Sequence, residues 1–268
     1  MRQINWDLDG VIVPSESYKA AQWALAKLRQ SGVLSEVDYN MLVAGDGTTA
    51  RRLYDWVCTE QAPLHQFVRG LAGLSRGETL RRLWSAFPEG GNAEDLDHLR
   101  DASKESVMGI MTEPIAGTVR FARAAAGRLR QAIVTQTDDA SVCSLIRRGV
   151  VPGGVFDAVV CCGGNPRLAA ISGSSAKKVA AHIAACEQFG VPPSAAIAID
   201  DSVDGLRAAR EAGLVCVGLR QAGNPHDLAA YADVVVSDLG PLARPDVIDA
   251  LANAGPAEVA ACLKGVAK

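Results

Sequence analysis

The pattern of apolar and polar positions divides the chain into two unlike parts. Residues from about 35 to 112 carry helical spacing only, with apolar residues recurring every three to four positions, as in 51–57 and 79–84. Glycine-rich joints separate these amphipathic segments. After Pro114, short apolar runs alternate with helical segments instead. We therefore expect no strand of the main sheet between residues 35 and 112.

The second part of the chain predicts a sheet whose strands alternate with helices. Expected strands are 131–135, 155–162, 195–199, 215–219 and 232–236, and expected helices are 119–126, 140–148, 176–189 and 205–212. A further short strand, residues 4–8, opens the chain. Such alternation is typical of a parallel sheet covered by helices on both faces. The sequence thus predicts an α/β core formed by residues 1–13 and 114–268, with an all-helical domain, residues 14–113, inserted.

Composition and charge exclude several classes of protein. The 268 residues are 49% hydrophobic and 21% charged, a globular balance that allows a sizeable core. The net charge of −3 gives no general attraction to nucleic acid or to anionic membranes. No apolar run reaches membrane-spanning length, and the N-terminus runs into an acidic motif rather than an apolar signal region. We expect a cytoplasmic protein with neither a nucleic-acid nor a membrane partner, of unknown oligomeric state.

Cysteine and histidine usage argues against disulfides and zinc. The seven cysteines are odd in number, form no CxxC pair and lie mostly inside apolar runs. Reduced thiols in a core are therefore expected. The four histidines are scattered without metal-ligand spacing. We interpret His182, inside the predicted helix 176–189, as a structural or surface residue.

The first candidate for chemistry is the acidic motif that ends the first strand. Asp7 and Asp9 flank Leu8 and are followed by Gly10, where the chain can turn and bring both carboxylates to one pocket. One carboxylate can attack phosphorus to form an aspartyl-phosphate, and a second can protonate the leaving oxygen and then deprotonate water. The bland alternative is an acidic turn, since Asp-Gly is common in turns.

Two further signals lie where other elements meet the same edge of the sheet. Thr135 ends an apolar strand, and its hydroxyl can donate to a phosphate oxygen, although threonine is also a good strand former. Lys177 and Lys178 lie near the start of a predicted helix, where a cation is unfavourable unless an anion is near. Either lysine could neutralise a phosphoryl group or could be solvated, and spacing alone does not choose between them.

The last signal is a pair of carboxylates at the end of another apolar strand. Asp200 and Asp201 are adjacent, and two ionised groups so close repel unless a cation neutralises them. Mg²⁺ prefers a few carboxylates together with carbonyl, water and phosphate oxygens. Asp204, in contrast, is expected to cap the helix that starts at Gly205.

Taken in order, these motifs resemble the haloacid dehalogenase-like superfamily. The chain reads DxDGV, an apolar strand ending in threonine, a lysine, then an apolar strand followed by DDSxxG, and the resemblance covers nearly the whole length. It implies a Rossmann-like doubly wound core with a helical cap that closes over the substrate. It makes Asp7 the nucleophile and Asp9 the acid/base. Asp7 and Asp201 would supply carboxylates to Mg²⁺, Asp9 a backbone carbonyl, and Asp200 would be a ligand or an outer-shell partner.

The resemblance also assigns the phosphate-binding groups. Thr135 and either Lys177 or Lys178 would hold the phosphoryl group, with Gln136 at a position where asparagine is frequent. Trp6 replaces the usual phenylalanine before the nucleophile. Neither departure removes a catalytic group, so we expect activity.

The resemblance favours a magnesium-dependent phosphatase that hydrolyses a small phosphorylated metabolite. Asp9 favours phosphate esters, because dehalogenases and phosphonatases of this group lack it. Sugar-phosphate mutases of the β-phosphoglucomutase type retain it and are the alternative, although Lys19 stands where they often carry a histidine. A phosphate-binding regulatory module without catalysis is the third possibility. Of the arginines in the helical segment, Arg51 is the preferred candidate for binding an anionic part of the substrate.

Overall fold

A computed structural model describes residues 1–71, 76–163, 165–221 and 227–266 of the chain. The chain folds into two compact units. One unit is Ser15–Thr112, and the other contains Met1–Pro14 together with nearly all of the chain from Glu113 onward. That the first of these acts as a mobile cap stays a prediction.

The larger unit is built on one parallel sheet. Its six strands have the order β3-β2-β1-β4-β5-β6, and every neighbouring pair is parallel. Their bounds are β1 Gln3–Trp6, β2 Arg130–Thr135, β3 Ala158–Cys161, β4 Ala196–Asp200, β5 Val215–Leu219 and β6 Val234–Val236. Because β1 pairs with both β2 and β4, the carboxyl ends of these three strands are neighbours. Ligands of such sheets bind at this edge.

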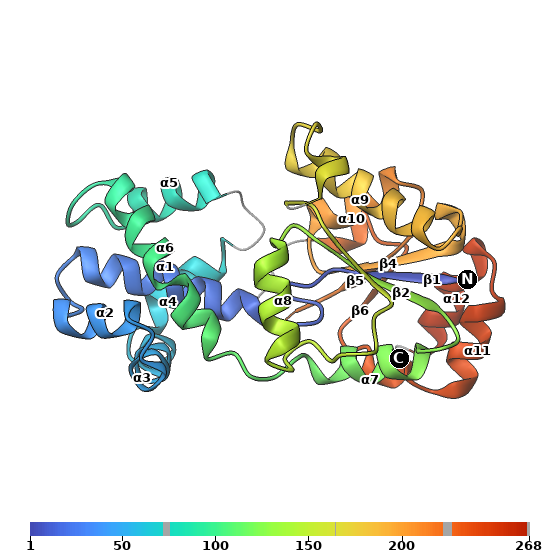
Figure 1. Ribbon diagram of the computed structural model, residues 1–268, viewed down its shortest axis with the longest axis horizontal. Coiled ribbons are helices and arrows are strands. Elements are labelled where there is room, and N and C mark those ends of the chain that lie inside the picture. The colour runs from blue at the N-terminus through green and yellow to red at the C-terminus, as the bar shows by residue number, and fades with distance from the viewer. Residues whose placement is uncertain (72–75, 164, 222–226, 267–268) are drawn as a thin grey trace. The chain divides into compact units, whose positions relative to one another are not determined.

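Helices cover both faces of the sheet (Figure 1). On one face lie α9 (Ser174–Gln188) and α10 (Val203–Glu211), and on the other lie α7 (Ala116–Ala125), α11 (Pro245–Asn253) and α12 (Pro256–Val266). A further helix, α8 (Asp139–Arg147), connects β2 to β3. The predicted Rossmann-like α/β class is therefore confirmed.

The two faces of the central strand differ in chemistry. Ile4 and Trp6 are fully buried, and the Trp6 ring packs edge-on against Phe121 of α7, with ring centroids 5.6 Å apart. The alternate residues Gln3 and Asn5 are also fully buried, and Asn5 contacts α9. Side chains of a strand alternate between faces, so β1 presents an apolar face to α7 and a polar face to α9.

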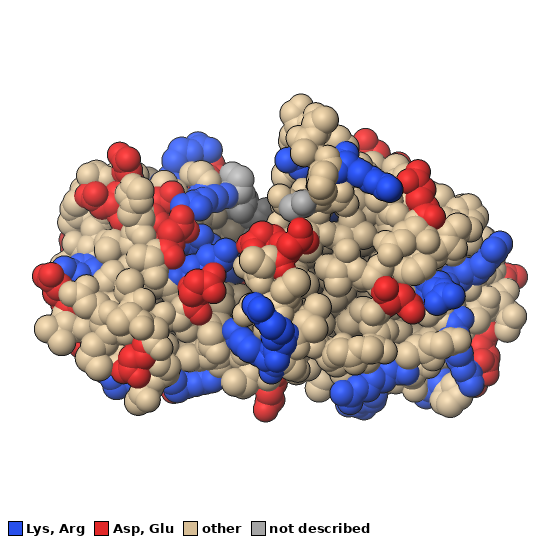
Figure 2. Space-filling model, viewed as in Figure 1, with Lys and Arg blue, Asp and Glu red and all other residues tan. Residues whose placement is uncertain are grey.

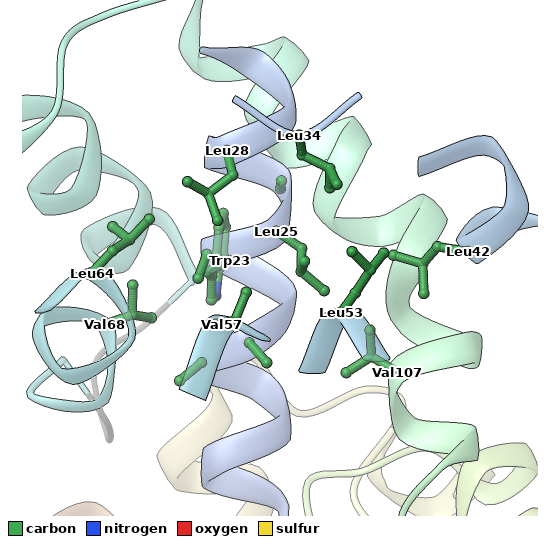
Figure 3. Packing of buried hydrophobic residues seen from close by; sticks show 14 of the residues in the cluster. Trp23, Leu25, Leu28, Leu34, Leu42, Leu53, Val57, Leu64, Val68 and Val107 are labelled. Atoms are coloured by element: carbon green, nitrogen blue, oxygen red, sulfur yellow. The ribbon is translucent and has the colours of Figure 1, made fainter. Parts of the chain in front are cut away.

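The smaller unit is entirely helical where it is described. It contains α1 Ser15–Gln30, α2 Glu36–Val43, α3 Gly47–Thr59, α4 Ala62–Arg69, α5 Arg76–Ala86 and α6 Ala93–Gly109. Helix α1 packs against α3, α4 and α6, and is therefore buried over most of its length. Figure 3 shows Leu25, Leu53 and Val107, from three of these helices, pointing toward one another. No strand occurs among the described residues of 35–112, as predicted.

Several predicted element bounds need correction. The strand expected over 4–8 ends at Trp6, because the following residues form a turn in which Gly10 N–H donates to the Val13 carbonyl. The strands expected over 155–162 and 232–236 shorten to β3 and β6, the stretches that their neighbours pair. Ser202, not Asp204, caps α10: its hydroxyl accepts from Gly205 N–H at 3.0 Å, and Asp204 lies inside the first turn.

The face of the protein in Figure 2 is dominated neither by positive nor by negative side chains. On the face in Figure 2, lysines and arginines are interspersed with aspartates and glutamates in small groups. None of the helices in the described ranges has the length and apolar character needed to cross a membrane. All seven cysteines are free thiols.

Candidate active site

Three carboxylates gather where β1 and β4 end. Asp7 directly follows β1, Asp200 is the last residue of β4 and Asp201 follows it. One oxygen from each lies within 4.8 Å of the others, and the three residues are between 1% and 8% exposed. The pairing of β1 with β4 brings them together, since Asp7 N–H donates to the Ile199 carbonyl at 2.9 Å.

Two glycines make room for these carboxylates. Gly10 has a φ of +75°, which L-residues rarely adopt, and a Cβ there would lie 1.9 Å from Asp201 Oδ2. Gly205 lies in the first turn of α10, where a Cβ would lie 2.0 Å from Asp200 Oδ2. Gly10 is therefore required both by its backbone conformation and by the nearby Asp201 carboxylate, whereas Gly205 is required because a Cβ would meet Asp200.

Lys178 is the cation of the cluster. Its Nζ donates to Asp7 Oδ1 at 2.9 Å and to Asp200 Oδ2 at 2.7 Å, and its side chain is 5% exposed. The adjacent Lys177 is half-buried. Of the two lysines in the sequence motif, the structure thus brings Lys178 to the carboxylates.

The acidic cluster holds three carboxylates, and among the described residues Lys178 is the cation bound to Asp7 and Asp200. The pKa of Asp7 is raised to about 7: burial is the largest cause, Asp200 and Asp9 add to the increase, and Lys178 opposes it. Burial alone would lower the pKa of Lys178, but Asp200 and Asp7 raise it well above its usual value. Three carboxylates therefore share one ammonium group. An all-oxygen donor set of this charge fits Mg²⁺.

Asp9 is held by a residue that sequence reasoning did not select. Thr137 Oγ1 donates to Asp9 Oδ2 at 2.7 Å, and the Thr137 backbone N–H donates to Thr135 Oγ1 at 3.1 Å. Thr135 is buried at the end of β2, as its predicted role requires. Gln136 is exposed, and within the described ranges its side chain makes no hydrogen bond that links it to the cluster.

Two more residues support the site. Ser202 binds Asp200 Oδ1 through its backbone N–H at 2.9 Å and its hydroxyl at 2.7 Å. Gln221, which follows β5, donates from Nε2 to the Gly10 carbonyl at 2.6 Å and so holds the turn after Asp9. The DDS motif contains the signal for Ser202, whereas no local pattern marks Gln221.

Arg51 lies in the helical unit, described by itself. Its guanidinium donates to the Ile110 carbonyl at 2.7 Å and lies 5.9 Å from the centroid of the Tyr54 ring. Together with Gly47 and Arg52 it lines an open groove of about 650 Å³. Four other arginines of this unit form ion pairs with carboxylates: Arg52 with Asp38, Arg76 with Asp97 and Asp101, and Arg81 and Arg82 with Glu78.

Comparison with known proteins defines the family. A family model described as haloacid dehalogenase-like hydrolase matches residues 1–213. The chain therefore belongs to the haloacid dehalogenase-like hydrolases. No curated protein matches the sequence significantly.

Solved structures share the fold across almost the whole chain. A provisionally named β-phosphoglucomutase from Thermotoga maritima is 19% identical, covers 99% of this chain and 100% of its own, and has a TM-score of 0.60. CbbY from Rhodobacter sphaeroides, solved in complex with phosphate, is 19% identical over 90% of this chain and 96% of its own (TM-score 0.59). A predicted phosphoglycolate phosphatase from Haemophilus somnus is 15% identical over 90% of this chain and 96% of its own (TM-score 0.62). At these identities the likeness is one of fold.

Proposed function

We propose that the protein is a magnesium-dependent phosphatase that hydrolyses a small phosphate monoester through an aspartyl-phosphate on Asp7. The observation that carries this proposal is the position of Asp7, buried at the edge of the sheet, in contact with the Lys178 ammonium and close to the acidic pair Asp200 and Asp201. Asp9, held by Thr137, supplies the second carboxyl group that the two-step reaction needs.

Each step balances with these residues. A carboxylate oxygen of Asp7 attacks phosphorus, the bond from phosphorus to the leaving oxygen breaks, and Asp9 gives its proton to that oxygen. Asp9, now ionised, then takes a proton from water while the water oxygen attacks the phosphorus of the aspartyl-phosphate. The acyl phosphate bond breaks, inorganic phosphate forms, and Asp7 and Asp9 return to their starting states.

The metal would be held by the carboxylates of Asp7 and Asp201 and the backbone carbonyl of Asp9, and would neutralise charge on the phosphoryl group. Asp200 supports the site from the outer shell in this proposal. Its Oδ2 accepts from Lys178 and its Oδ1 accepts twice from Ser202, so both oxygens already have partners. Asp201, the next residue in the sequence, would bind the metal directly.

Phosphate binding is assigned to Lys178 rather than Lys177, with the Thr135 hydroxyl as a further donor. Lys178 has the required position, because its ammonium group lies 2.9 Å from the nucleophile. Gln136, which follows Thr135 and has an exposed side chain, stays a candidate for binding the phosphoryl group. Arg51 is the candidate for a second anionic group of the substrate, because its nearest described partner is a neutral carbonyl.

A sugar-phosphate mutase is the second candidate. Its support is the fold shared with the Thermotoga maritima protein, whose TM-score is close to that of the phosphatase from Haemophilus somnus. Lys19, where mutases of this type often carry a histidine, forms an ion pair with Glu16 at 3.1 Å, which favours the phosphatase. A regulatory module without catalysis has less support, since it needs no Asp7, Asp9 and Lys178 set.

Phosphate release over a panel of sugar, nucleotide and organic-acid phosphates tests the proposal. We expect release from at least one compound with Mg²⁺, loss of release with excess chelator, and no turnover by a folded Asp7→Asn variant. Full activity of Asp7→Asn or in chelator would contradict the nucleophile or the metal. Product analysis with a sugar bisphosphate present separates the candidates, because a mutase would isomerise the sugar phosphate without net phosphate release.

A further inference from the structure

The polar face of the central strand continues beneath the nucleophile. Gln3, Asn5 and Asp7 alternate along β1 and its end, and all three are buried. Strands inside a parallel sheet covered on both faces are usually apolar throughout. Burying an amide is unfavourable unless it is hydrogen-bonded. The two amides beneath Asp7 therefore call for a structural reason.

Helix α9 presents a matching row of residues. Lys178, His182 and Cys186 are four positions apart and thus share one face of the helix. Lys178 bonds to Asp7, and one turn further along the helix His182 bonds to Asn5, where Asn5 Nδ2 and His182 Nδ1 are 3.3 Å apart. Each of these two turns of α9 is therefore tied to β1 by a polar contact.

The direction of each hydrogen bond follows from its neighbours. Gln3 Nε2 donates to Asn5 Oδ1 at 2.6 Å, so the amide nitrogen of Asn5 faces α9. That nitrogen is a donor, so His182 Nδ1 accepts in the neutral imidazole whose proton is on Nε2, a buried atom that has no hydrogen-bond partner among the described residues. Asn5 Nδ2 also lies 3.4 Å from the His182 backbone carbonyl and so contacts both the side chain and the backbone of the helix. Burial is the main cause that lowers the pKa of His182 to about 3; Lys178 contributes to the decrease and Asp200 opposes it.

The other contacts between α9 and the sheet are mostly small and apolar. Ala181 and Ala185 pack in one cluster with Ala132 and Val134 of β2. Apolar contacts are not directional, and small side chains such as alanine do little to prevent α9 from sliding along its own axis. Hydrogen bonds have narrow ranges of distance and angle. Apart from the bonds of Lys178 itself, the contacts of Asn5 Nδ2 with His182 Nδ1 and the His182 carbonyl are thus the directional contacts that can set the axial position of α9 next to Lys178.

We propose that Asn5 and His182 form a positioning pair that sets the register of α9 against β1 and thereby holds the Lys178 ammonium between Asp7 and Asp200. His182 is one helical turn from Lys178, so a shift of the helix at His182 moves Lys178 with it. The neutral ring adds no second positive charge to the row. This inference rests on the proposed function only for its effect on catalysis.

A mutant cycle with Lys178 tests the pair. We expect His182→Leu and Asn5→Ala each to lower kcat roughly 10- to 100-fold, because a displacement of about 1 Å can cost this much in rate. In a Lys178→Ala background the same changes should alter the residual kcat by less than about twofold, because a positioning pair acts through Lys178. His182→Asn, whose Oδ1 takes the position of the imidazole Nδ1 and can accept from Asn5 Nδ2, should keep kcat within about threefold of wild type.

The control is Ile248→Ala, a fully buried residue of α11 on the opposite face of the sheet. Its loss of stability should leave kcat unchanged at temperatures where the protein is folded. If the His182→Leu effect is fully retained in the Lys178→Ala background, or if Ile248→Ala lowers kcat as much at equal loss of stability, the positioning role is wrong.

Crystal structures separate this inference from the proposed function. In wild type, Lys178 Nζ lies 2.9 Å from Asp7 Oδ1 and 2.7 Å from Asp200 Oδ2. We expect at least one of these contacts to be lost in His182→Leu or Asn5→Ala and both to be kept in His182→Asn. Unchanged contacts in both disruptive variants would overturn the positioning pair even if no phosphate ester is hydrolysed. Lack of hydrolysis by wild type, with the contacts behaving as expected, would overturn only the phosphatase.

Discussion

The Thr137 hydroxyl donates to Asp9 Oδ2 at 2.7 Å, and this bond links the proposed acid/base to the end of β2. Thr137 is in turn held by its backbone N–H, which donates to the Thr135 hydroxyl at 3.1 Å. The two threonines therefore connect the phosphate-binding end of β2 with the carboxyl group that must reach the leaving oxygen. We therefore expect Thr137 to orient Asp9 through this hydrogen bond.

Thr137→Val should lower kcat roughly 10-fold, because a hydrogen bond to a charged group contributes about 1.5–3 kcal/mol. The change keeps the shape of the side chain and removes only the hydroxyl. Thr118→Val is the matched control: Thr118 in α7 is buried, and its hydroxyl has no hydrogen-bond partner among the described residues. It should leave steady-state kinetics unchanged. Equal kinetics for both variants would show that Asp9 does not depend on Thr137.

Lys178→Ala should reduce kcat at least about 100-fold, whereas Lys177→Ala should change it less than threefold. The first change leaves Asp7 and Asp200 buried without their ammonium partner, and such uncompensated charge is strongly unfavourable. The second removes a half-buried lysine one position away. Initial rates with Mg²⁺, together with circular dichroism to confirm folding, measure both. The reverse order of effects would assign phosphate binding to Lys177.

Gly205→Ala should abolish activity although alanine favours helices by about 1 kcal/mol over glycine. The added Cβ would lie 2.0 Å from Asp200 Oδ2, so either the carboxylate or the start of α10 must move. Gly109→Ala is the control, because Gly109 is also helical and its Cβ would meet no atom within 4 Å. It should keep full activity and gain stability. An active Gly205→Ala variant would mean that Asp200 can move without loss of function.

The motifs at strand ends were predictable because they depend on local order. An apolar strand followed by Asp7, Thr135 or Asp200 indicates an edge residue, and parallel strands bring their ends to one edge. The choice between Lys177 and Lys178 was not predictable, because it depends on which face of α9 packs on the sheet. The sequence also predicts the start of α9 at residue 176, two positions after its observed start at Ser174. Tertiary packing therefore decides which face of the helix, and so which lysine, points to the sheet.

Other parts of the site depend on tertiary contacts that no local pattern reports. Thr137 lies two positions after Thr135, the residue that the motif at the end of β2 points to, and it contacts Asp9 across 128 residues of sequence. The sequence predicts a structural or surface role for His182, and the residue is buried. Its contact with Asn5 could not be predicted, because the two residues are 177 positions apart in the sequence. The sequence predicts Asp204 as the cap of α10, whereas Ser202 caps it; serine and aspartate both cap helices well, so the residue types do not distinguish the two positions.

His182 should make the protein more sensitive to acid. Its folded pKa of about 3 is below its usual 6.5, so the folded state binds fewer protons than the unfolded state between these values. Its contribution to stability is therefore complete above pH 6.5 and is lost as pH falls below it, by up to about 1.4 kcal/mol per pH unit. Urea unfolding with chelator, from pH 7.5 to 4.5, measures the free energy of unfolding. The difference between wild type and His182→Gln should shrink or reverse as pH falls, whereas parallel curves would show that His182 does not titrate on unfolding.

Asp9→Asn should slow the reaction unequally for different leaving groups. The alkoxide that leaves a sugar phosphate is unstable and needs a proton in the transition state, whereas nitrophenolate hardly needs one. Loss of a positioned acid removes about 10²–10⁴-fold in rate, so formation of the aspartyl-phosphate should fall by this much with a sugar phosphate and far less with p-nitrophenyl phosphate.

The second step should behave differently in the same Asp9→Asn variant. Hydrolysis of the aspartyl-phosphate should slow equally for the two substrates, because the intermediate on Asp7 is the same and Asp9 would be the base that activates water. Rapid-quench experiments resolve the two steps. Thr137→Val, which leaves the Asp9 carboxyl in place but removes its 2.7 Å donor, should show the same pattern with smaller losses. Equal losses in phosphorylation for both leaving groups would mean that Asp9 acts only on the metal site, and another group would have to carry the proton.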